Sequence, residues 1–73
     1  REERKLKRII ENIEIDIEDI EITIGNIESK FSEPDFHLDH KNMNETQAEY
    51  EKQKDLLESK MSEWEENSHS LES

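Results

Sequence analysis

An unbroken column of apolar residues, spaced alternately four and three positions apart, runs through the first half of this chain. Its members are Leu6, Ile10, Ile13, Ile17, Ile20, Ile24, Ile27 and Phe31. A second, less regular column with the same spacing follows at Met43, Gln47, Tyr50, Lys54, Leu57, Met61, Trp64, Ser68 and Leu71. Such spacing is typical of the a and d positions of coiled-coil helices. The sequence therefore predicts two long amphipathic helices.

The two columns match end to end if the second helix folds back on the first. We expect these pairs along the seam, the line where the helices face each other: Phe31–Met43, Ile27–Gln47, Ile24–Tyr50, Ile20–Lys54, Ile17–Leu57, Ile13–Met61, Ile10–Trp64 and Leu6–Ser68. Every pair joins an a position to a d position, as antiparallel coiled-coil helices require. The predicted fold class is all-α, a two-helix antiparallel coiled-coil hairpin. We expect a monomer, with pairing between chains in a helical dimer as the alternative.

The composition makes this seam necessary for folding. Only 29% of the residues are apolar and 42% are charged, and chains this polar stay disordered unless their apolar residues share one surface. Isoleucines that alternate with polar residues between Ile13 and Ile24 also resemble strands. The heptad column is much longer than these runs, so we favour a helix.

The chain is predicted to form a single domain over residues 1–73. We expect a first helix at about 1–31, a turn at 32–41, a second helix at about 42–67 and a frayed tail at 68–73. Pro34 ends the first helix, because the residue before a proline avoids the α region. Asp39 or Asn42 is expected to cap the second helix, the latter in a capping box with Glu45.

The sequence also leads to predictions for a glycine within the first helix and for two apolar residues in the turn. Gly25, which costs a helix interior about 1 kcal/mol relative to alanine, lies on the solvent face, and whether it breaks the helix stays open. Phe36 and Leu38 are expected to fold over the Phe31–Met43 end of the seam.

Charged residues beside the seam are expected to pair across the two helices, some with opposite charges and some with like charges. The expected pairs are Glu14–Glu58, Glu21–Glu51, Lys7–Glu65 and Asp16–Lys60. We expect the Lys54 stem to lie along the seam while its ammonium emerges between Glu21 and Glu51. Since two pairs attract and two repel, the apolar seam must dominate the stability.

The charge is distributed unevenly along a chain whose net charge is −11. The candidate nucleic-acid-binding residues are the five cations at the start, Arg1, Arg4, Lys5, Lys7 and Arg8, because cations release counterions from phosphates. The candidate partner-docking residues are an acidic ridge of Glu14, Glu21, Glu51 and Glu58 and an apolar strip of Ile15 and Ile22 on the back of the first helix.

Residues for catalysis and for cofactor binding are not expected in this chain. It has no cysteine, its single glycine excludes a glycine-rich phosphate loop, and a two-helix hairpin lacks a substrate cavity. His37 and His40 lie in the expected turn without a third ligand, so we expect no metal site. Without an apolar run of membrane-spanning length, we expect a cytoplasmic chain. Because it starts at Arg1 in helix-like sequence, we expect it to be excised from the C-terminus of a larger protein.

The order of features resembles one known module. A basic start, a long Ile-, Leu- and Glu-rich helix and the turn Glu33-Pro34-Asp35-Phe36 are followed by Glu49-Tyr50, Leu57-Glu58 and Trp64-Glu65-Glu66. This order is similar to the C-terminal coiled-coil domain of ABC-F ATPases, the Uup-like soluble relatives of ABC transporters. Gly25 departs from the pattern, and so does Asn67, where an apolar residue usually follows.

The resemblance implies a bacterial, cytoplasmic parent protein with two ATP-binding domains that use ATP and Mg²⁺. Such proteins act on the ribosome in translation or antibiotic resistance, and the Uup type is associated with DNA binding. The expected function is a non-catalytic arm that contacts rRNA, DNA or the ribosome through its basic start. The alternative is a spacer or interaction element that docks on a ribosomal protein or on the parent's ATPase domains.

Overall fold

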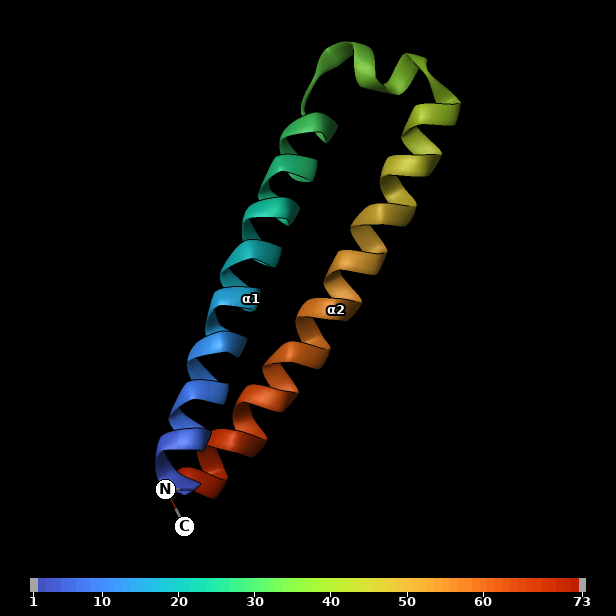
Figure 1. Ribbon diagram of the computed structural model, residues 1–73. Helices are drawn as coiled ribbons and strands as arrows, with labels where there is room; N and C mark the ends of the chain where they lie inside the picture. The colour runs from blue at the N-terminus through green and yellow to red at the C-terminus, as the bar shows by residue number, and fades with distance from the viewer. Residues whose placement is uncertain (1, 73) are drawn as a thin grey trace.

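Two long helices lie side by side in the computed structural model, which describes residues 2–72 (Figure 1). Helix α1 spans Glu2–Phe31, the short 3-10 helix η1 spans Pro34–Leu38, and α2 spans His40–Glu72. The described residues form a rod of 55 × 14 × 13 Å, with the start of α1 and the end of α2 at one end and η1 at the other. Within residues 2–72 there is no strand. The predicted all-α antiparallel hairpin is confirmed.

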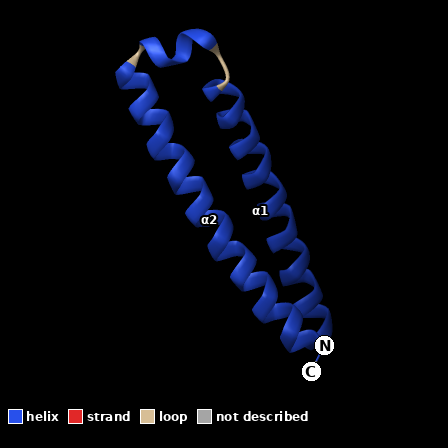
Figure 2. Cartoon of the chain, turned by 180° about the vertical axis from the view of Figure 1, so that it is seen from behind, coloured by secondary structure: helices blue, strands red, loops and turns tan. Residues whose placement is uncertain are grey.

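Non-helical backbone is confined to the two ends of η1, as the view from behind shows (Figure 2). Helix α2 begins at His40, two residues earlier than expected, because the Asp39 Oδ1 accepts a hydrogen bond of 3.1 Å from the Asn42 backbone N–H. Asp39 is therefore the cap, and the capping box at Asn42 is not used. The second helix also runs further than the expected end near residue 67: α2 continues to Glu72, and the half-buried Leu71 extends the seam by another turn.

The seam of α1 is the predicted one, whereas α2 presents a different face. Ile13, Ile20 and Ile27 are buried, and the remaining column residues of α1 are half-buried. On α2 the less exposed residues are Met43, Thr46, Tyr50, Gln53, Leu57, Lys60, Asn67, Ser68 and Leu71. The expected seam residues Gln47, Lys54 and Met61 are instead exposed. Helix α2 is thus turned about its axis relative to the prediction.

The contacts also indicate a different register from the predicted pairs. The Tyr50 ring packs edge-to-face on Phe31, with 5.4 Å between ring centroids, so Tyr50 lies closer to the turn than pairing with Ile24 allows. We infer that the large residues Tyr50, Leu57 and Trp64 lie opposite Ile27, Ile20 and Ile13. This register places each large side chain of α2 against one of the three buried isoleucines. Polar residues of α2 then lie in the neighbouring layers: Thr46, which is buried, and Gln53 and Lys60, which are half-buried.

Aromatic residues close the turn end of the seam. Phe36 is buried, and its ring packs edge-to-face on Phe31 with 5.4 Å between centroids, an arrangement favoured by the ring quadrupoles. Phe31 therefore lies between Phe36 and Tyr50. The expectation that residues of the turn cover this end is correct for Phe36 but wrong for Leu38, which is 78% exposed.

Helix α1 passes through Gly25 without a break. A Cβ atom added there would meet nothing within 4 Å, so the position has no steric need for glycine. The helix is held by the isoleucines on its opposite face, which outweigh the low propensity of one glycine.

We expect Gly25→Ala to raise the free energy of unfolding by about 0.5–1 kcal/mol, because alanine is a better helix former and no neighbour must move. Urea unfolding followed by circular dichroism measures this change. Ala48→Gly, at an exposed position of α2, is the matched control and should lower the stability by a similar amount. A loss of stability in Gly25→Ala would contradict the open environment of this site.

Candidate functional site

The basic start of α1 forms the first candidate surface. Arg4, Lys5, Lys7 and Arg8 are exposed or nearly so and, with Glu11, line a shallow depression of about 410 Å³. This surface, here called the basic end, lies on the first turns of α1, at the end of the rod away from η1 (Figure 1). The fifth predicted cation, Arg1, lies outside the described residues.

Ion pairing at the basic end is weak. The Lys7 ammonium lies 4.0 Å from the Glu3 carboxylate one turn earlier, rather than against Glu65 as predicted. Exposed pairs of this kind contribute about 0–1 kcal/mol, so Glu3 holds Lys7 only weakly.

Lys60 links the two helices near the middle of the rod. Its ammonium lies 3.3 Å from the Asp16 carboxylate on α1 and 3.6 Å from Glu63 on α2. The predicted Asp16–Lys60 pair is confirmed. The hydrogen bond to Asp16, followed by the charge of Glu63, raises the pKa of Lys60 above its ordinary value of 10.5.

Because the pKa of Lys60 is raised in the folded state, part of the stability of the hairpin is lost at alkaline pH. The contribution of Lys60 is complete below pH 10.5 and is lost as the pH rises through the higher pKa of the folded state. We expect Lys60→Gln to reduce the loss of stability on going from about pH 9 to about pH 11, as measured by thermal unfolding at each pH. Lys52→Gln, at an exposed position, is the control. Identical pH profiles for the two variants would contradict the assignment.

Lys54 does not lie along the seam, which corrects the sequence prediction. The Lys54 side chain is exposed, and its ammonium lies 5.1 Å from the centroid of the Tyr50 ring, within cation–π range. Because α2 is turned, Gln53 faces α1 in its place. The Gln47 amide donates a 3.1 Å hydrogen bond to the Glu51 carboxylate, the group expected to receive Lys54.

The structure separates the residues of the predicted acidic ridge. Glu14 and Glu21 lie beside one groove between the helices. Glu58 instead lines a shallow depression made by α2 residues alone, so it does not share a site with Glu14. The expected pairing of these two carboxylates followed from the wrong face of α2.

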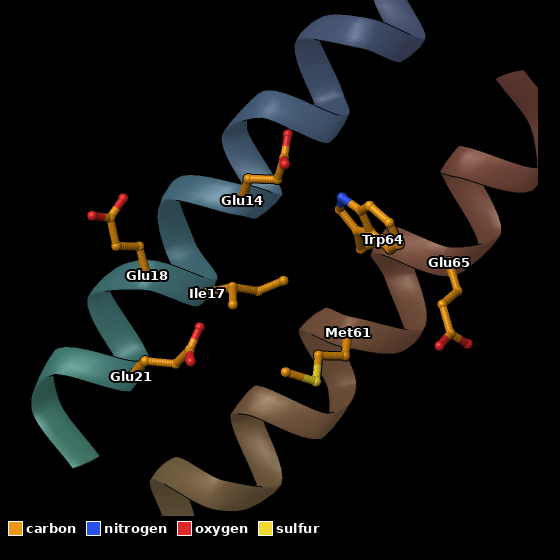
Figure 3. A pocket seen from close by; sticks show the side chains of 7 residues that line it. All are labelled: Glu14, Ile17, Glu18, Glu21, Met61, Trp64 and Glu65. Carbon is orange, nitrogen blue, oxygen red and sulfur yellow. The ribbon is translucent and has the colours of Figure 1, made fainter. Parts of the chain in front are cut away.

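The groove beside Glu14 and Glu21 was not predicted from the sequence. It has a volume of about 390 Å³ and is lined by Glu14, Ile17, Glu18, Glu21, Met61, Trp64 and Glu65. Ile17 from α1 and Met61 and Trp64 from α2 point toward one another across it (Figure 3). Met61 is 43% and Trp64 38% exposed, whereas the heptad spacing placed both inside the seam. We call this surface the acidic groove.

The predicted apolar strip lies on the outside of α1. Ile15 and Ile22 are each 56% exposed and lie seven residues apart, which places them on one helix face. No residue of α2 covers them, since the seam runs along the other side of α1.

The turn histidines show no sign of a metal centre. The His37 ring packs edge-to-face against Phe36 with 5.8 Å between centroids, and His40 is the first residue of α2. Among residues 2–72, His, Asp and Glu side chains nowhere gather in a group of three suited to a metal ion. In the part of the chain that the structure describes, no helix is long and apolar enough to cross a membrane.

Comparison with known protein families gives a match over most of the chain. Residues 1–68 match the family described as the ABC transporter C-terminal domain, a stretch that includes α1, η1 and most of α2. No curated protein and no solved structure matches the chain.

Proposed function

Because the chain belongs to the ABC transporter C-terminal domain family, we propose that it is the non-catalytic arm of an ABC-F, Uup-like ATPase of the cytoplasm. The turn Glu33-Pro34-Asp35-Phe36, on which that subtype rests, supports the proposal because its aromatic residue is the buried one that closes the seam. ATP and Mg²⁺ would belong to the parent's ATP-binding domains. The arm itself would offer surfaces to a partner.

The proposed role of the arm is to contact the phosphates of rRNA or DNA through its basic end. The observation that carries this proposal is the cluster of Arg4, Lys5, Lys7 and Arg8 at one tip of an otherwise acidic rod. Cations that meet phosphates release counterions and so bind without reading the sequence. Since the acidic body repels the same phosphates, only the tip would approach them.

Binding to duplex DNA and to rRNA fragments at several salt concentrations tests this role. Arg4→Gln, Lys5→Gln and Arg8→Gln are combined in one variant, which leaves the Lys7–Glu3 pair in place. The control variant combines Lys30→Gln, Lys41→Gln and Lys52→Gln, which remove the same charge elsewhere. We expect only the first variant to lose about tenfold or more in affinity and to flatten the salt dependence. A flat salt response of the unchanged protein, or equal losses in both variants, would argue against the role.

Docking of the arm on a protein partner is the second candidate, and the exposure of Ile15 and Ile22 favours it. The partner would be the parent's ATPase domains or a ribosomal protein. Ile15→Lys combined with Ile22→Lys should then abolish association with the purified ATPase domains or ribosomes while circular dichroism stays unchanged. Asn12→Lys combined with Asn26→Lys adds the same charge at exposed positions of α1 and should leave association intact. Unchanged association in the isoleucine variant would exclude the strip.

A further inference from the structure

The acidic groove combines apolar walls with charged side chains that are all negative. Ile17, Met61 and Trp64 provide the walls, and the other lining residues are Glu14, Glu18, Glu21 and Glu65. No lysine or arginine is among them. In Figure 3 the carboxylates of Glu14 and Glu21 stand on either side of Ile17, on the side that faces Trp64. Glu18 and Glu65 point away from the centre and contribute charge at the outer edge.

Met61 and Trp64, which line the groove from α2, are more exposed than their packing in a two-helix hairpin requires. A tryptophan and a methionine that only closed the seam would be covered by α1, as the isoleucines opposite are. They keep more than a third of their surface in contact with water instead. Exposed tryptophan beside methionine is a common feature of surfaces that bind other proteins, since both residues offer large contact areas.

The chemistry of the groove selects its occupant. An arginine or lysine side chain can lie with its stem on Met61 and Ile17 and its charge near the Trp64 ring, a favourable cation–π partner. Carboxylates at Glu14 and Glu21 can then pair with the cation. Nucleic acid and anionic lipid would meet only like charge here, so neither fits the groove.

We propose that the acidic groove binds a cationic amphipathic peptide segment of a partner protein. Such a segment would place apolar side chains on Met61 and Trp64 and its lysines or arginines against Glu14 and Glu21. The site is separate from the basic end and from the Ile15–Ile22 strip, so it stands independently of the proposed function.

Trp64 is the only tryptophan of the chain, so its fluorescence reports directly on the groove. The probe is a short amidated helical peptide of lysine and leucine, and its counterpart has glutamate in place of lysine. We expect the lysine peptide to shift the Trp64 emission to shorter wavelength with saturable binding that weakens as salt is added. The glutamate peptide should leave the emission unchanged.

Two pairs of substitutions distinguish binding in the groove from attraction to the negative charge of the whole rod. Glu14→Gln with Glu21→Gln should weaken binding of the lysine peptide by about fivefold or more. Glu28→Gln with Glu45→Gln removes the same charge at exposed positions that do not line the groove and should change it by less than about twofold. Met61→Ser should weaken binding while circular dichroism stays unchanged.

Four results would overturn the proposal. Equal weakening by the two glutamate pairs, or binding without a change in Trp64 emission, would mean that the peptide is attracted to the acidic rod as a whole. A dimer in sedimentation without peptide that dissociates in the Arg4, Lys5 and Arg8 variant would mean that a second copy of the chain fills the groove. Binding of the glutamate peptide would exclude selection by charge.

Discussion

Replacing Ile20 with alanine is expected to lower the free energy of unfolding by about 2–4 kcal/mol. Ile20 is 7% exposed and lies in the middle of the seam, so the cavity left by its side chain opens between the two helices. A chain of this size has little other apolar surface to bury, so the variant should be largely unfolded at moderate temperature. Thermal and urea unfolding followed by circular dichroism measure the loss.

Ile22→Ala is the matched control for that experiment. It removes the same atoms two positions away on the same helix, but its side chain is 56% exposed. We expect a change within about 0.5 kcal/mol, as for most surface substitutions. Similar losses in both variants would mean that α1 does not present the face to α2 described above.

Replacing Phe36 with alanine is expected to cost about 3 kcal/mol or more, an unusual effect for a residue in a turn. Phe36 is 6% exposed and packs on Phe31, which in turn contacts Tyr50. Its removal therefore exposes the end of the seam and loosens the connection between the helices. The loss can be measured by urea unfolding, and hydrogen exchange should show faster opening of residues near the turn.

Leu38→Ala tests the same turn without touching the aromatic cluster. Leu38 is 78% exposed, so we expect a change within about 0.5 kcal/mol. A large effect of Leu38→Ala together with a small effect of Phe36→Ala would contradict the arrangement of η1.

The basic end and the acidic groove differ in the sign of their charge, and neither includes the four buried apolar residues of the hairpin. The basic end attracts phosphates, whereas the acidic groove attracts cationic segments, and each repels the ligand of the other. The buried residues Ile13, Ile20, Ile27 and Phe36 belong to neither surface. Surface substitutions can therefore alter binding with little effect on the fold, which is what makes the binding variants above informative.

Much of the fold could be predicted from the sequence because its signals are local. The four-and-three spacing from Leu6 to Phe31 requires a helix with one apolar face, and Pro34 requires that this helix end. Asp39 was one of two predicted caps, and Phe36 was expected at the end of the seam. The basic end is a cluster within two helical turns, so it was also visible in the sequence.

The sequence by itself thus determined the two helices, the turn between them and the basic end, and only the tertiary structure decided which face of α2 meets α1. Met43, Tyr50, Leu57, Trp64 and Leu71 fit the heptad spacing equally well with Gln47, Lys54 and Met61 or with Thr46, Gln53 and Lys60. The choice depends on contacts between distant residues, namely Tyr50 on Phe31 and Lys60 on Asp16. That rotation leaves Met61 exposed beside Trp64, and the two side chains line the acidic groove.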